Sequence, residues 1–228
     1  MTGLVRKATL FAVCGLLAAG SAFASVPSPA NSVCPPCFSL VGSDGVAIDG
    51  DGEFCVTVRD LANLPINNSL VVVDLSACSG LQICDNNESG FTVDCGTQTV
   101  RGFTGVGGVI CFRIKGHANN GPIGDTSPVN PYNCAKIYAD GVLLCSPSVS
   151  AFDHDGNGMG PADLSCWRGD FFSAGNPPGA SRSDYNCSGD VGPADLSRWL
   201  DVFFDVAANG ASTTNCPAGG KGQCSPIP

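Results

Sequence analysis

Gly160-Pro-Ala-Asp-Leu-Ser165 returns 32 residues later as Gly192-Pro-Ala-Asp-Leu-Ser197, towards the end of this 228-residue chain. A segment rich in Asp and Gly precedes each copy. Aromatic residues follow both copies at matching distances, so that Trp167 corresponds to Trp199. A match of this extent indicates a duplicated unit of loop and helix.

The second loop, which starts at Asp184, has the pattern of a calcium-binding loop. Oxygen-bearing side chains occupy its positions 1, 3, 5 and 12, glycine occupies position 6, and position 7 offers a backbone carbonyl. Ca²⁺ takes about six to eight oxygen ligands, which a loop bent at glycine and closed by a late carboxylate supplies. The predicted ligands are Asp184, Asn186, Ser188, Asp190 (through its carbonyl) and Asp195.

The first loop has the same pattern but is one residue shorter. Its predicted ligands are Asp153, Asp155, Asn157, Met159 (through its carbonyl) and Asp163. Nothing in it corresponds to Val191, so we expect the deletion to re-angle the following helix or to pull Asp163 off the metal. The first site should therefore bind more weakly. For both loops the alternative is a plain turn without an ion.

Each loop leads into a helical pattern. Pro161 and Pro193 suit the first turn of a helix, where no N–H is needed. Apolar residues then recur at spacings of three and four, and they are Leu164, Trp167 and Phe171 in the first copy and Leu196, Trp199, Leu200, Phe203 and Phe204 in the second. We expect two short helices that bury these faces against each other.

These paired Asp-x-Asn/Asp-x-Asn/Ser-Gly loops, each followed by a helix, give residues 150–207 a resemblance to the type I dockerin family. The resemblance implies two bound Ca²⁺ ions and folding coupled to the metal. It also implies a helix face that docks onto a protein partner, either a cohesin-like protein or another surface protein.

Residues 1–24 match a secretory signal peptide. Arg6 and Lys7 precede an apolar run that is too short to span a bilayer, and Ser21-Ala-Phe-Ala24 gives the cleavage site. We expect a soluble product, secreted or held at the cell surface, without a membrane span. The net charge of −9 excludes electrostatic attraction to nucleic acid.

All of the 14 cysteines except Cys14 lie beyond this leader, a density typical of disulfides in an oxidising compartment. The expected pairs are Cys55–Cys111, Cys134–Cys145, Cys166–Cys187 and Cys216–Cys224, while the pairing of Cys34, Cys37, Cys78, Cys84 and Cys95 stays open. The odd remainder leaves a free thiol, an intermolecular disulfide or a bond to a partner. Cys34-Pro-Pro-Cys37 has the spacing of a redox pair, but no thioredoxin-like alternation surrounds it, so we expect structural disulfides there.

Between a linker (25–37) and a Cys-bracketed tail (208–228), residues 38–149 alternate short apolar strands with turns. The clearest strand segments are 54–59, 69–74, 98–103, 109–114 and 136–139. About seven or eight such strands suit a β-sandwich of two sheets. The expected fold is thus mainly β, a sandwich followed by a small α-helical module.

The order of pieces in this region resembles the bacterial immunoglobulin-like domains of the invasin and intimin type. The resemblance lies in Val56-Thr-Val-Arg-Asp60, a turn through Asn63-Leu-Pro65, Val71-Val-Val-Asp-Leu75, and the segment from Phe103 to Ile114. It implies a spacer or adhesive scaffold with no catalytic site of its own.

No residue pattern assembles a catalytic site, so we expect no enzyme. His117 and His154 lack Cys or His partners at zinc spacing and are expected on the surface. Asp49-Gly-Asp51-Gly-Glu53 is expected to form a hairpin turn, with a bound ion as the alternative.

The sequence favours a secreted, non-catalytic, calcium-binding component of an extracellular assembly. The alternative is a carbohydrate-binding or carbohydrate-degrading accessory protein delivered by its dockerin. The chain's two tryptophans both lie in the helical repeats, which leaves little aromatic surface for sugar stacking elsewhere. A third hypothesis makes the helical pair an intramolecular brace for the sandwich, without any partner.

Overall fold

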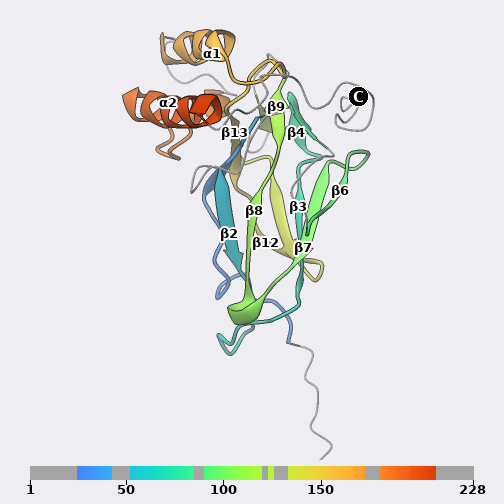
Figure 1. Cartoon of the computed structure of the whole chain (residues 1–228). Coiled ribbons are helices and arrows are strands. Elements are labelled where there is room, and N and C mark those ends of the chain that lie inside the picture. Colours follow the sequence, from blue (N-terminus) through green and yellow to red (C-terminus); the bar gives the residue numbers. More distant parts are fainter. Residues whose placement is uncertain are drawn as a thin grey trace, which may run out of the picture.

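The computed structural model describes residues 25–42, 52–84, 90–119, 123–125, 133–172 and 180–208 (Figure 1). Strands make up most of its regular structure. Two helices, α1 (Pro161–Phe172) and α2 (Pro193–Ala208), follow the strands in the chain and lie at one end of the β region in Figure 1. The prediction of a mainly β protein with a small helical C-terminal part is confirmed at this level.

One sheet has five antiparallel strands. In spatial order they are β12 (Val142–Cys145), β11 (Lys136–Ala139), β3 (Leu70–Asp74), β7 (Thr99–Phe103) and β6 (Thr92–Asp94). Val73 in the central strand pairs with Val100 on one side and Ile137 on the other, and none of the three is exposed to solvent. Alternate residues of β3 are buried, as expected for a strand with one face on a core.

A second layer contributes to the same hydrophobic core. β2 (Glu53–Thr57) pairs antiparallel with β8 (Val109–Arg113), and β1 (Cys37–Leu40) pairs parallel with β13 (Ser148–Ala151). Phe54 stacks on Phe112 with ring centroids 5.6 Å apart, in the cluster that also holds Val73. The shorter elements are β4 (Cys78–Ser79), β5 (Leu81–Ile83), β9 (Gly116–Ala118), β10 (Gly124–Asp125), η1 (Val106–Gly108) and η2 (Ala180–Ser183).

The strand predictions agree well with this architecture. The five segments expected from the sequence coincide, to within a residue or two, with β2, β3, β7, β8 and β11. Their alternation of buried apolar and exposed polar residues is the pattern that favoured strands. The immunoglobulin-like topology stays a prediction.

The described cysteines form disulfides that differ in part from expectation. They are Cys34–Cys145, Cys37–Cys187, Cys55–Cys111 and Cys78–Cys134, and Cys84 and Cys95 are also disulfide-bonded. The prediction for Cys55–Cys111 is confirmed, because these residues lie opposite each other on β2 and β8. Cys216–Cys224 lies outside the described residues.

Two expected pairs, Cys134–Cys145 and Cys166–Cys187, are wrong. Cys145 lies opposite Ile137 in the β11–β12 ladder, so Cys134 is beyond the end of that ladder and reaches Cys78 instead. Cys166 carries a free thiol and is partly exposed. It is thus the odd cysteine among those described.

Cys34 and Cys37 bond to different partners, which excludes a redox pair between them and confirms structural disulfides. Disulfides of this number are typical of extracellular or secreted proteins. Among the described helices, none is long and apolar enough to cross a membrane.

Two hydrophobic clusters divide the chain between Ala151 and Phe152. The larger cluster lies in the β region and ends with Ala151 at the close of β13. The smaller one begins with Phe152 and includes Trp167 of α1 and Trp199 of α2. Both helices therefore contribute side chains to one small core next to the β region. Phe204, which was expected on the buried face of the second helix, is exposed instead.

Candidate metal centre

The two predicted calcium loops share one backbone pattern. At position 4, Gly156 has φ 76° and Cys187 has φ 63°; at position 6, Gly158 has φ 92° and Gly189 has φ 87°. Left-handed backbone at two equivalent positions is uncommon, above all for a non-glycine residue such as Cys187. The sequence repeat is therefore also a repeat of loop conformation.

Carboxylates converge in the first loop. One oxygen from each of Asp153, Asp155 and Asp163 lies within 4.8 Å of the others. Asp153 and Asp163 have no exposed surface. The carboxylate of Asp153 accepts hydrogen bonds from the backbone N–H groups of Gly156 (2.7 Å) and Gly158 (3.1 Å), so the loop wraps around its first residue. Three close carboxylates form the hard, all-oxygen donor set that Ca²⁺ prefers.

The carboxylate that closes each loop also caps the helix that follows. Asp163 accepts hydrogen bonds from the N–H groups of Gly160 (2.7 Å) and His154 (2.6 Å). Asp195 does the same with Gly192 (2.8 Å) and Tyr185 (2.8 Å). A carboxylate in the first turn that reaches back to the N-cap N–H stabilises the start of a helix. The same side chain thus links loop closure to helix formation.

The second loop gathers its predicted side chains around backbone N–H groups. Asp184 accepts from the N–H groups of Ser188 (3.1 Å) and Gly189 (2.9 Å). Asn186 Oδ1 accepts from the N–H of Ser188 (2.8 Å), and Ser188 Oγ donates to Asp190 Oδ1 (2.6 Å). Asp195 closes the loop and is fully buried, whereas Ser188 and Asp190 are exposed.

The shorter first loop keeps Asp163 in its carboxylate cluster, so the deletion does not pull this residue away. The structure also revises the alignment of the two loops. Met159 and Val191 both directly precede the N-cap glycine of a helix, and both are buried in the small core. Met159 therefore takes the place of Val191, and the residue without a counterpart is Asp190.

Burial, together with neighbouring negative charge, raises the pKa of two of these acidic groups, Asp163 and Asp184. Burial raises the pKa of Asp163 from 3.8 to about 7, and the charges of Asp153 and Asp155 add to the effect. The difference corresponds to a free energy on the order of 4 kcal/mol against the ionised form. Burial, with the charge of Asp195, also raises the pKa of Asp184. A divalent cation would offset both effects.

Both histidines are buried, so the expectation of surface positions is wrong. His117 is 3% exposed and His154 is not exposed at all. His154 Nδ1 lies 3.1 Å from the carbonyl oxygen of Asp163, and its Nε2 lies 3.3 Å from both Ser183 Oγ and Tyr185 Oη. Burial lowers the pKa of His154, which favours the neutral imidazole. Sequence spacing could not reveal these contacts, because Ser183 and Tyr185 lie 29 and 31 residues further along the chain.

A salt bridge completes this buried network. Arg182 donates to both oxygens of Asp170, at 2.7 and 2.8 Å, and Ser183 Oγ donates to Asp170 Oδ2 at 2.6 Å. A Ser–His–Asp triad would need the carboxylate on the histidine. Here Asp170 bonds Ser183 instead, and Ser183 has no exposed surface. The network joins α1, η2 and the first loop.

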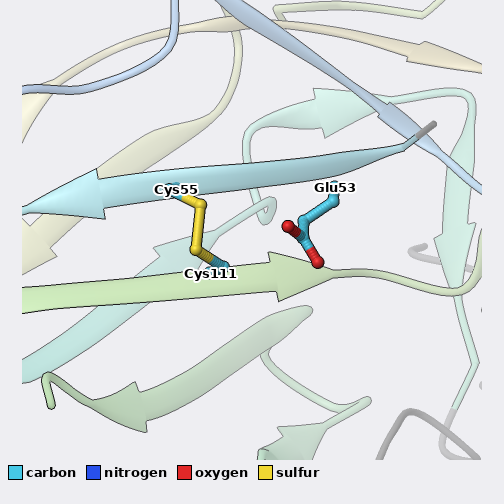
Figure 2. A group of neighbouring side chains, drawn as sticks. All are labelled: Glu53, Cys55 and Cys111. Carbon is cyan, nitrogen blue, oxygen red and sulfur yellow. A yellow bond between two sulfur atoms is a disulfide. The ribbon is translucent and has the colours of Figure 1, made fainter. Parts of the chain in front are cut away.

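A second group of potential metal ligands lies on the outer face of β2 and β8 (Figure 2). Figure 2 shows Cys55 and Cys111 joined as a disulfide beside Glu53. Bonded sulfurs provide no thiolate for a metal, and Glu53 accepts from Arg113 at 3.1 Å. This group is a cross-strand staple with an ion pair. Of the segment Asp49-Gly-Asp51-Gly-Glu53, residues 49–51 lie outside the described part.

The chain matches no known protein family model. It likewise matches no curated protein and no solved structure. The two Asp- and Gly-rich loops, 153–163 and 184–195, are therefore the main basis for a functional proposal.

Calcium uptake by the first loop should release a proton. Because the pKa of Asp163 is raised in the folded protein, protonation stabilises the metal-free fold, and this contribution falls as pH rises from about 4 to about 7. Ca²⁺ binds the ionised carboxylate, so its affinity should fall as pH drops below about 7. Calorimetry at about pH 6 in two buffers of different ionisation enthalpy measures the released proton. Equal heats in both buffers would contradict the assignment, and Asp163→Asn is the matched control.

Proposed function

We propose that residues 150–207 bind two Ca²⁺ ions and present a docking face, and that the protein is an exported, non-catalytic component of an extracellular or cell-surface assembly. The observation that carries the proposal is the carboxylate cluster of Asp153, Asp155 and Asp163. Two of these side chains have no contact with solvent that could stabilise their charge. A bound cation provides that stabilisation.

The first calcium site would be held by Asp153, Asp155, Asn157 and Asp163. Met159 would still offer its backbone carbonyl, although its side chain takes the core position of Val191 and the first loop has no counterpart of Asp190. The second would be held by Asp184, Asn186, Ser188, the Asp190 carbonyl and Asp195. Bound Ca²⁺ supplies positive charge and oxygen coordination that fix each loop. The chain's own residues provide the closing carboxylate at each helix start, so metal binding and helix capping support each other.

The docking face is suggested by equivalent phenylalanines at the ends of both helices. Phe171 stacks on Trp167 and Phe203 stacks on Trp199, with centroids 5.2 and 5.0 Å apart. The next residue in each case, Phe172 or Phe204, is 74% or 62% exposed. Large apolar side chains exposed at repeated positions favour an interaction with a protein surface. The β region would act as the disulfide-stapled, immunoglobulin-like spacer.

Substitution of the closing carboxylates separates the two calcium sites. In the full mature chain we expect two bound Ca²⁺ ions, one after Asp195→Asn, and one after Asp163→Asn. Each change removes the negative charge of a ligand and replaces one of the two oxygens that accept backbone N–H groups by an NH2 donor. Calorimetric titration with CaCl₂ measures the stoichiometry. Absence of calcium binding to the unmodified protein would overturn the proposal, and Asp140→Asn, in the β region, is a control for a lost carboxylate.

Loss of the exposed phenylalanines should remove docking but not metal binding. The double change Phe172→Ala and Phe204→Ala should abolish calcium-dependent retention of purified protein on the envelope fraction of its source cells. Calcium affinity should stay unchanged, because each phenylalanine lies nine residues, or about two and a half helical turns, beyond the carboxylate that closes its loop. Phe103→Ala, at a residue 60% exposed on β7, is the matched control. Retention by the double variant, or retention that polysaccharide alone competes away, would favour the carbohydrate alternative.

A further inference from the structure

The β region contacts both loops at the same position of the repeat. In the second loop, position 4 is Cys187, which forms a disulfide with Cys37 of β1. In the first loop, position 4 is Gly156, and a Cβ built there would lie 2.7 Å from the imidazole of His117 in β9. The ring of His117 thus lies directly against the loop backbone. A covalent bond in one loop corresponds to a close packing contact in the other.

Neighbouring contacts fix the first loop further. The N–H of Ala118, also in β9, donates to the carbonyl oxygen of Asp153 at 2.9 Å. The N–H of Phe152, just before that loop, donates to the carbonyl oxygen of Leu40 in β1 at 3.1 Å. His117 is buried, and its Nδ1 lies 3.0 Å from the carbonyl oxygen of Ala118, which holds the ring in place. Positions 1 and 4 of the loop are both fixed by β9.

The backbone at position 4 of each loop has a left-handed conformation, which surrounding contacts have to hold in place. Both residues there have positive φ, and Cys187 adopts it despite its side chain. Such backbone persists where the surrounding structure holds it. The turn at position 4 brings positions 3 and 5 together, since Asn157 Nδ2 donates to Asp155 Oδ2 at 2.6 Å and the N–H of Ser188 donates to Asn186 Oδ1 at 2.8 Å. A change at position 4 would therefore alter how two of the proposed ligands are arranged for a cation. Groups that orient ligands without touching the metal commonly change metal affinity by about 10- to 100-fold.

We infer that the β region presets both calcium loops, through His117 for the first and the Cys37–Cys187 disulfide for the second. The inference rests on the proposed calcium binding. It makes His117 and Cys37 positioning residues, which raise metal affinity without contacting metal. The helical part is then no autonomous docking module, because its metal sites are completed by β1 and β9.

The test measures each loop alone in the full mature protein. In the Asp195→Asn background, which reports on the first loop, His117→Ala should weaken calcium binding about 10-fold or more. In the Asp163→Asn background, which reports on the second loop, the double change Cys37→Ser and Cys187→Ser should do the same. Each anchor change should leave the other loop's affinity unaltered. Loss of the distant disulfide by Cys55→Ser and Cys111→Ser should change neither.

Conservative variants separate positioning from a folding defect. His117→Phe keeps a ring against Gly156 and should retain affinity within about threefold, since the packing contact remains. If His117→Ala fails to fold, Gly156→Ala replaces it. A side chain at this positive φ is strained and its methyl group would clash with the imidazole, so both effects disturb position 4 and should lower affinity in the first loop only. Calcium binding in which neither anchor alters affinity would overturn the inference while leaving the proposed function intact. No calcium binding by either loop would overturn the proposed function itself.

Discussion

The C-terminal part of the protein depends on buried carboxylates that must be compensated where each helix begins. Asp163 and Asp195 have no exposed surface, and each accepts hydrogen bonds from the N-cap glycine of its helix and from the second residue of its loop. Backbone N–H groups stabilise a negative charge only in part. In the first loop, one oxygen from each of three carboxylates lies within 4.8 Å of the others, and under the proposed function a divalent cation would offset their negative charge.

This constraint explains why loops, helices and the small core form one unit. The closing carboxylate fixes the helix start, and the residue just before the N-cap glycine, Met159 or Val191, enters the core. The helix then carries Trp167 or Trp199 into the same core. A change in either loop therefore reaches the helix through the capping bond and through the buried apolar side chain.

Local features of the fold followed from the sequence, and long-range ones did not. Strands such as β3 were predictable because each is a short run rich in apolar and β-branched residues between turn-forming residues. The loop–helix units were predictable because each is contiguous and duplicated. Cys34 and Cys37, by contrast, are three residues apart yet bond to Cys145 and Cys187. Those partners are brought close only when β1 lies beside β13 and the second loop packs against β1.

In the candidate site, too, the local features were predictable from the sequence and the long-range contacts were not. The order of carboxylates and glycines pointed to Asp153, Asp155 and Asp163, whose carboxylates meet in the first loop. Among the described residues no such group of three acidic side chains forms in the second loop, although the sequence favoured that loop. The order of residues gave no signal for His117 and His154, which are buried by contacts between the β region, η2 and both loops. It also misplaced the deletion. The 32-residue spacing of the repeat already sets Met159 over Val191, and the burial of both side chains agrees with that alignment. The local sequence pattern therefore points to candidate metal ligands, whereas contacts between distant segments determine how those side chains are held.

The first loop is joined to the β region by backbone hydrogen bonds and the second loop by a disulfide, so any docking surface on the helices would be presented on a firm support. Such a support suits the idea of a spacer that holds a docking face away from its attachment point. The disulfide and hydrogen bonds between the helical part and the β region also fit the hypothesis that the helical pair braces the β region.

Hydrogen exchange measured by mass spectrometry on the mature protein, with excess Ca²⁺ and with excess chelator, tests the central claim most directly. Calcium should slow exchange in both loops, 153–163 and 184–195, and at the starts of α1 and α2, with little change in β3 and β7. Identical exchange in both loops under the two conditions would contradict it.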